Sequence, residues 1–130
     1  MEMDFLLEDA EKPYGIRHRC FFFAKSIIVF VKACKYDYVF RSLFDQLIRS
    51  AASVGANVVE GRAGSSKKDW LRFLTIALKS SNEVKYWLCL IRYTLDVDRK
   101  KFNELLTEAD EISKIIASII INAGKKTKES

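Results

Sequence analysis

The chain is predicted to be all-α, an antiparallel up-down-up-down four-helix bundle, on three observations. Its 130 residues contain one proline and five glycines, so few residues would interrupt a helix. Apolar residues recur every three or four positions through four long segments, which is the spacing of a buried helix face. The connections between these segments are short, which favours antiparallel neighbours. No stretch alternates with a period of two for long enough to predict a βαβ unit.

The pattern divides the chain into three parts. Residues 1–17 lack sustained periodicity and hold the single proline, so they are predicted to form a flexible N-terminal arm. Residues 18–123 are predicted to form the four-helix bundle. Residues 124–130 are polar and contain three lysines, which predicts a basic C-terminal tail.

The first two helices differ in how much apolar surface they carry. The first is expected at about 19–35, and its residues 21–23 and 27–31 are apolar on nearly every side. Because a bundle helix needs only one apolar stripe, we expect this helix to pack on two sides and to support an oligomer. The second is expected at about 40–60 with a single stripe, and Gly61 is predicted to end it.

The third and fourth helices carry capping signals. Ser66 followed by Asp69 is typical of a capping box and predicts a helix from there to about Thr94. Asp98 is predicted to cap the fourth helix, which should continue to Asn122. A strand is the alternative for the isoleucine-rich segment 115–121, since β-branched residues favour sheets. The preceding segment 104–114 runs into it in helical phase, so the helix is preferred.

Two oppositely charged pairs predict the register of the central hairpin. Arg49 and Glu60 lie eleven residues apart before its connection, and Arg72 and Glu83 lie eleven apart after it. Eleven residues make about three helical turns, which returns to within about 20° of the same face. The residue numbers of Arg49 with Glu83, and of Glu60 with Arg72, both add up to 132. These four residues are therefore predicted to form structural ion pairs across the hairpin, without a catalytic role.

The net charge of +5 is unevenly distributed. Residues 60–101 hold ten basic and five acidic side chains, whereas residues 102–122 hold four acidic side chains and one lysine. Such a basic region is compatible with an anionic partner such as RNA, although a solvated helical surface has the same composition. The candidate nucleic-acid contacts, besides the C-terminal lysines, are Arg62, Lys67, Lys68, Lys79, Lys85, Arg99, Lys100 and Lys101.

We predict no catalytic centre, cofactor, metal site or membrane segment. Cys20, Cys34 and Cys89 lack metal-ligand spacing, and His18 is the single histidine, so we expect reduced thiols that fill the core. The acidic start is unlike an export signal, and the apolar stretch 21–31 is too short to cross a bilayer. We therefore expect a cytoplasmic protein that is not an enzyme.

The central hairpin resembles a known family. Segment 53–61 reads SVGANVVEG, and segment 66–84 reads SKKDWLRFLTIALKSSNEV. Both are similar to an ordered motif of the four-helix-bundle proteins encoded in intervening sequences of bacterial 23S ribosomal RNA genes, and the match covers roughly residues 46–90. The chain differs from that motif at Gly55, where the family usually has proline, at Val59 in place of alanine, and at Lys79 in place of glycine.

The resemblance implies a bacterial, intracellular helical bundle with no known enzymatic activity. It also implies a ring-like homo-oligomer, with a pentamer favoured, and a relation to the accessory variability proteins of retroelements, which are basic and engage nucleic acid. Two functions remain open. The first is binding of RNA, including ribosomal RNA, or of a ribonucleoprotein; the second is a scaffold or accessory subunit for another protein, with no direct nucleic-acid contact.

Overall fold

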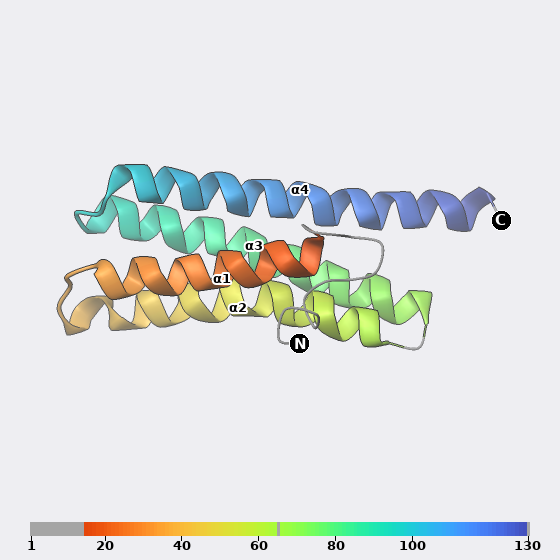
Figure 1. The fold of residues 1–130 in the computed structure, drawn as a ribbon, viewed down its shortest axis with the longest axis horizontal. Coiled ribbons are helices and arrows are strands. Elements are labelled where there is room, and N and C mark those ends of the chain that lie inside the picture. Colours follow the sequence, from red (N-terminus) through yellow and green to blue (C-terminus); the bar gives the residue numbers. More distant parts are fainter. Residues whose placement is uncertain (1–14, 65, 130) are drawn as a thin grey trace.

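The computed structural model of the protein describes residues 15–64 and 66–129, with side chains through residue 125. Within these ranges the chain forms four α-helices, a short 3-10 turn and no strand (Figure 1). The all-α prediction is confirmed. Residues 1–14 of the predicted arm lie outside the described ranges, whereas Ile16 and Arg17, which were also assigned to the arm, begin the first helix. The elements are α1 (Ile16–Ala33), η1 (Tyr38–Phe40), α2 (Arg41–Ala63), α3 (Lys67–Thr94) and α4 (Arg99–Glu129).

The four helices form a ring of antiparallel neighbours. Contacts join α1 to α2, α2 to α3, α3 to α4 and α4 back to α1. The α2–α3 seam contains the hydroxyl pair Ser53–Ser80 at 2.9 Å, and the α3–α4 seam contains Ser81–Ser113 at 2.7 Å. Arg19 on α1 closes the ring by donating to Glu108 on α4. This is the up-down-up-down arrangement predicted from the short connections.

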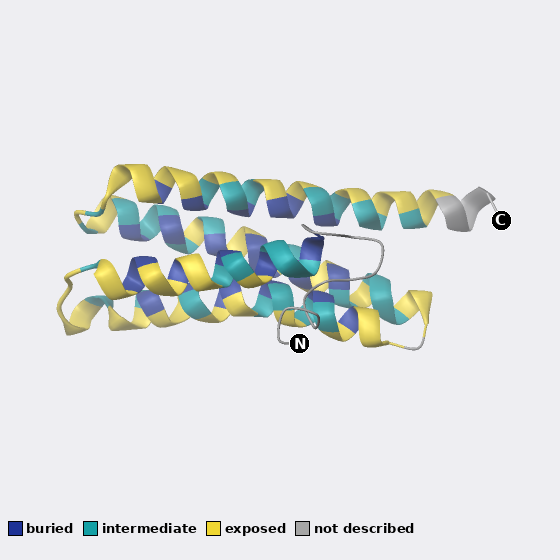
Figure 2. Ribbon diagram, viewed as in Figure 1, coloured by how far each residue is buried: buried dark blue, intermediate teal, exposed yellow. Residues whose placement is uncertain are grey.

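The core is built from the apolar stripes that the sequence pattern predicts (Figure 2). The largest side chains in it are fully enclosed, and burial of each such Leu, Ile or Phe stabilises the fold by about 1.5–3 kcal/mol. The strand alternative for segment 115–121 is wrong, because Ile116 is a fully buried position of α4. Fully buried residues include Ile27, Phe44, Leu47, Val54, Val58, Leu74, Val84, Leu88, Ile91, Ile112 and Ile116.

Both predicted N-terminal caps are present. The backbone N–H of Asp69 donates to the Ser66 hydroxyl at 3.1 Å, and α3 ends at Thr94 as predicted. The backbone N–H of Lys101 donates to the Asp98 carboxylate at 3.1 Å. Each cap satisfies an amide that the first helical turn leaves without an intrahelical acceptor.

Two predicted helix ends are wrong. α2 continues past Gly61 to Ala63, and Gly61 is buried. A Cβ at Gly61 would lie 2.8 Å from Cε3 of Trp70 and 2.9 Å from Cβ of Phe73, so this glycine allows α3 to approach closely and does not end the helix. α4 runs to Glu129, so the residues predicted as a separate tail continue the helix.

The helices differ in length, which makes the two ends of the bundle unlike. α1 has 18 residues and α4 has 31, or about 27 and 46 Å at 1.5 Å per residue. In Figure 1, α2, α3 and α4 continue well past the first residue of α1. The α2–α3 connection lies at this three-helix end. We call residues 60–72, which form the connection and its flanking turns, the hairpin end.

Candidate nucleic-acid interface

The predicted hairpin register is confirmed to within one residue, but the predicted ion pairs are not formed. Ser50 donates to Glu83 at 3.1 Å, and the residue numbers of this pair and of Ser53–Ser80 both add up to 133. Arg72 pairs with Asp69 at 3.8 Å. Among the described residues, the ion pairs within 4.0 Å join neither Arg49 to Glu83 nor Glu60 to Arg72.

The physical reason lies in solvent exposure. The side chains of all four predicted partners are exposed. An exposed ion pair contributes only about 0.2–1 kcal/mol, so nearer partners compete successfully. Arg72 meets Asp69 three residues earlier on the same helix, and its guanidinium lies 4.4 Å from the centroid of the Phe73 ring.

Serine hydroxyls, and not ion pairs, make the polar contacts across the α2–α3 seam, Ser50 with the Glu83 carboxylate and Ser53 with Ser80. Besides pairing with Ser80, Ser53 accepts a hydrogen bond from Nδ2 of Asn57 at 3.0 Å on its hydroxyl and another at 2.8 Å on its backbone carbonyl. Ser50 and Ser80 are buried. Small polar side chains let the two helices approach closely while each hydroxyl keeps a partner.

The hairpin end gathers exposed basic side chains. Arg62 lies in the last turn of α2, Lys67 and Lys68 begin α3, and Arg72 follows one turn later. The guanidinium of Arg62 lies 5.1 Å from the centroid of the Trp70 ring, which is within the range of a cation–π interaction. This interaction keeps the positive charge at the hairpin end. The acidic side chains in residues 60–72 are Glu60 and Asp69, so this end is net positive.

The predicted contacts do not form one surface. Lys79 is exposed midway along α3. Arg99, Lys100 and Lys101 begin α4 at the opposite end of the bundle, where Lys101 pairs with Glu104 at 3.8 Å. The structure therefore places Arg62, Lys67 and Lys68 together at one end and the α4 trio at the other (Figure 1).

Lys85 is engaged within the bundle and is a poor candidate for a phosphate contact. Its ammonium pairs with Asp110 on α4 at 3.2 Å, and Lys114 reaches the same carboxylate at 3.0 Å. Hydrogen bonds from Lys114 and Lys85 lower the pKa of Asp110. Residue spacing could not reveal the pair of Lys85 and Asp110, because these residues lie 25 positions apart on different helices.

Two features of the hairpin end were not predicted from the sequence. Arg72 was assigned to a structural pair, whereas its side chain is exposed beside the other basic residues. Trp70 and Phe73 are only partly buried and carry arginines over their rings. Arg72 and Phe73 are adjacent in the sequence, which was an available signal, whereas Arg62 and Trp70 lie on different helices.

The described residues contain no group of three or more His, Cys, Asp and Glu side chains placed to hold a metal ion. Burial raises the pKa of the Cys20 thiol to about 12 and also raises the pKa of Cys34, so neither thiol is activated as a nucleophile. In the part of the chain that the structure describes, no helix is long and apolar enough to span a membrane.

The fold and the hairpin end together define a class of small all-α bundles with a basic hairpin tip. Residues 14–118 match the model of the 23S rRNA-intervening sequence protein family, and the chain belongs to that family. No curated protein matches the chain.

A solved structure supports the same assignment. It is a crystal structure at 1.70 Å resolution of a protein of unknown function from the S23 ribosomal protein family of Bacteroides thetaiotaomicron. The two chains share 31% sequence identity with a TM-score of 0.72, and the alignment covers 82% of this chain and 98% of that one.

Proposed function

We propose that the protein is a non-enzymatic helical bundle that binds structured RNA or a ribonucleoprotein through its hairpin end. The observation that carries the proposal is the grouping of Arg62, Lys67, Lys68 and Arg72 on exposed positions around one connection. Lys67 and Lys68 also begin a 28-residue helix, whose N-terminal amides and dipole favour a phosphate.

The opposite end of the bundle is a weaker candidate because its charges are mixed. Arg99, Lys100 and Lys101 lie there between acidic residues of the α3–α4 connection and Glu104 of α4. Asp98 caps α4 and Glu104 pairs with Lys101, so acidic groups already occupy this surface. These acidic groups would repel a polyanion. The repulsion is weaker at the hairpin end, where basic side chains are in excess.

A filter-binding titration with 23S rRNA fragments tests the assignment. The charge reversal K67E/K68E is compared with R99E/K100E, which changes the net charge by the same amount at the other end. We expect K67E/K68E to weaken binding at least tenfold and to reduce the salt slope by about 1.4–1.8, since each phosphate contact contributes roughly 0.7–0.9. R99E/K100E should change affinity less than threefold.

The RNA proposal fails if wild-type affinity does not fall as salt rises, or if the two double variants lose affinity equally. Equal losses would indicate a general effect of net charge without a localised interface. Circular dichroism of both variants, recorded alongside, checks that the helices remain formed.

We further propose that the protein acts as a cytoplasmic homo-oligomer, with a pentamer favoured by its family resemblance. The supporting observation is the outer face of α1, where Phe21 is 47% exposed and Ile28 is 43% exposed. A stable interface covers about 800 Å² per partner, and these side chains would lie within such an area. Light scattering coupled to size exclusion, with and without nuclease, measures the subunit number; a monomer mass would refute this proposal.

A further inference from the structure

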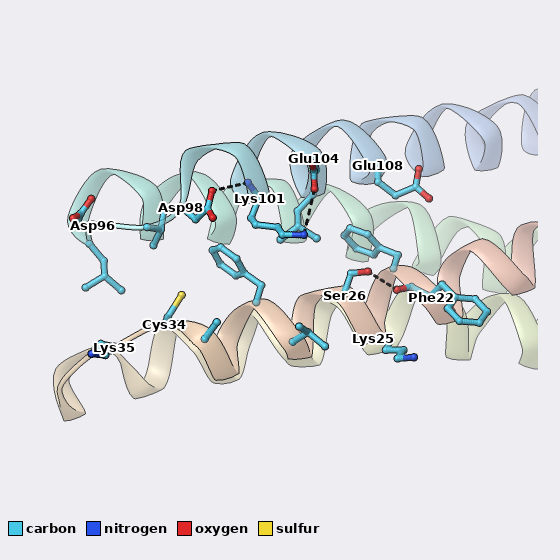
Figure 3. A pocket seen from close by; sticks show the side chains of 17 residues that line it. Phe22, Lys25, Ser26, Cys34, Lys35, Asp96, Asp98, Lys101, Glu104 and Glu108 are labelled. Carbon is cyan, nitrogen blue, oxygen red and sulfur yellow. Dashed lines mark hydrogen bonds and ion pairs between the residues drawn. The ribbon is translucent and has the colours of Figure 1, made fainter.

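A half-open groove of about 920 Å³ lies between α1 and α4, on the half of the bundle away from the hairpin end (Figure 3). It runs along α1 from Phe22 to Ala33, continues past Cys34 and Lys35, and follows α4 from Lys101 to Glu108. One end lies beside the ion pairs of Arg19 with Glu108 and Glu111, the latter at 2.7 Å. The other end lies at the α3–α4 connection, residues 95–98.

The lining of this groove is apolar at its base. Phe23, Phe30 and Leu105 contribute buried side chains that are 3%, 7% and 6% exposed. Val29 stands at the surface of the groove and is 58% exposed. An occupant that covered Val29 would remove apolar surface from water, which favours binding by about 25 cal/mol per Å² covered.

The length of the groove fits a short α-helix. From Phe22 to Ala33 the groove follows twelve residues of α1, or about 18 Å at 1.5 Å per residue. That length matches about three helical turns. A helix lying between α1 and α4 would present apolar residues at i, i+3 or i+4, and i+7, which is the pattern of a helix bound in a groove.

The charges on the two rims differ in sign. Lys25 and Lys35 stand on the α1 rim. Asp96, Asp98 and Glu104 stand on the rim formed by the α3–α4 connection and α4, where Lys101 is bound to Glu104. A partner helix with acidic residues on one flank and basic residues on the other would match both rims, and the match would set its direction.

We propose that this groove binds an amphipathic helix of a protein partner, about three turns long, with its acidic flank against α1 and its basic flank against α4. A second copy of this chain matches less well. Its α1 carries the exposed apolar pair Phe21 and Ile28 but no acidic residue, so it lacks the acidic flank that would match the lysine rim. The proposal is independent of RNA binding, which concerns the other end of the bundle.

Fluorescence titration with three synthetic 15-residue helical peptides tests the proposal on the full-length protein. All three carry the same leucine stripe. One has glutamates on one flank and lysines on the other, one has lysines on both flanks, and one has glutamates on both. We expect the mixed peptide to bind at least tenfold more tightly than either control peptide.

Two valine variants locate the binding site. Val29→Glu places a charge within the groove and should weaken binding of the mixed peptide at least tenfold. Val39→Glu makes the same change at a valine that is 64% exposed and does not line the groove, and it should leave the affinity within twofold. Circular dichroism verifies that both variants remain helical. The mixed peptide should also slow the labelling of Cys34, which lines the groove, by a thiol reagent.

Three results would overturn the proposal. The first is equal binding of all three peptides, which would indicate non-specific apolar contact. The second is equal loss of affinity in Val29→Glu and Val39→Glu. The third is a wild-type oligomer that does not bind the peptide, together with a Val29→Glu variant that no longer forms the oligomer. That result would identify a second copy of this chain as the occupant.

Discussion

Replacing Gly61 by alanine tests the close approach of α2 and α3. In a helix, Gly→Ala normally stabilises by about 0.8–1 kcal/mol, because alanine loses less backbone entropy on folding. At Gly61 the new Cβ would lie 2.8 Å from Cε3 of Trp70 and 2.9 Å from Cβ of Phe73. Both atoms are held rigidly, one in an indole ring and one bonded directly to the Cα of Phe73, so α3 would have to shift.

The size of the effect follows from two opposing contributions. Overpacking of a well-packed contact costs about 1–3 kcal/mol, which exceeds the helical gain. We therefore expect Gly61→Ala to destabilise the protein by up to about 2 kcal/mol. Gly124→Ala in α4 is the matched control, because a Cβ there meets nothing within 4 Å and the substitution keeps the helical gain.

Thermal unfolding of the two variants at one protein concentration measures the difference. We expect Gly124→Ala to be the more stable by about 1–3 kcal/mol, which is roughly 3–15 °C in Tm for a chain of this length. Equal stabilisation by both substitutions would show that a Cβ at residue 61 has room. The account of Gly61 as a helix-contact residue would then be wrong.

Three further predictions concern the polar and thiol groups of the bundle. Because hydrogen bonds from lysines lower the pKa of Asp110 below its usual 3.8, its contribution to stability is present above that pH and is lost as the pH falls through the lowered value. Urea unfolding should show that the stability difference between wild type and Asp110→Asn shrinks below about pH 4; a constant difference down to pH 2 would contradict this. Removing either hydroxyl of the buried pair Ser81–Ser113 should cost about 1 kcal/mol, and removing both should cost clearly less than the sum. Strict additivity in this double-mutant cycle would argue against a shared hydrogen bond. Cys20 is fully buried and its pKa is raised to about 12, so native protein should expose at most two fast-reacting thiols at pH 8, and three after unfolding. A rapid third thiol in the native protein would place Cys20 at the surface.

Much of the fold follows from interactions within one or two helical turns, and these could be predicted. The caps at Ser66 and Asp98 involve partners three residues away, so their effect is visible in sequence. The apolar stripes depend only on the helical repeat of about 3.6 residues. The same local information identified Arg62, Lys67 and Lys68 at the hairpin end, but it did not assign Arg72 to that surface.

The contacts between helices were decided by tertiary structure. Arg19 and Glu108 lie 89 residues apart, and no sequence pattern joined them. The hairpin register was predicted to within one residue, yet one residue turns a helix by about 100°. That rotation places Ser50, and not Arg49, beside Glu83.

The amino-acid sequence by itself thus determined the number of helices, their apolar faces and the basic hairpin connection. Tertiary structure decided which side chains meet across the seams, why Gly61 must be small, and where α1 and α4 leave a groove. The physical reason is the sequence separation over which the two kinds of interaction act. Helix formation responds to neighbours a few residues away, whereas a contact between helices depends on their rotation and offset to within a few ångström.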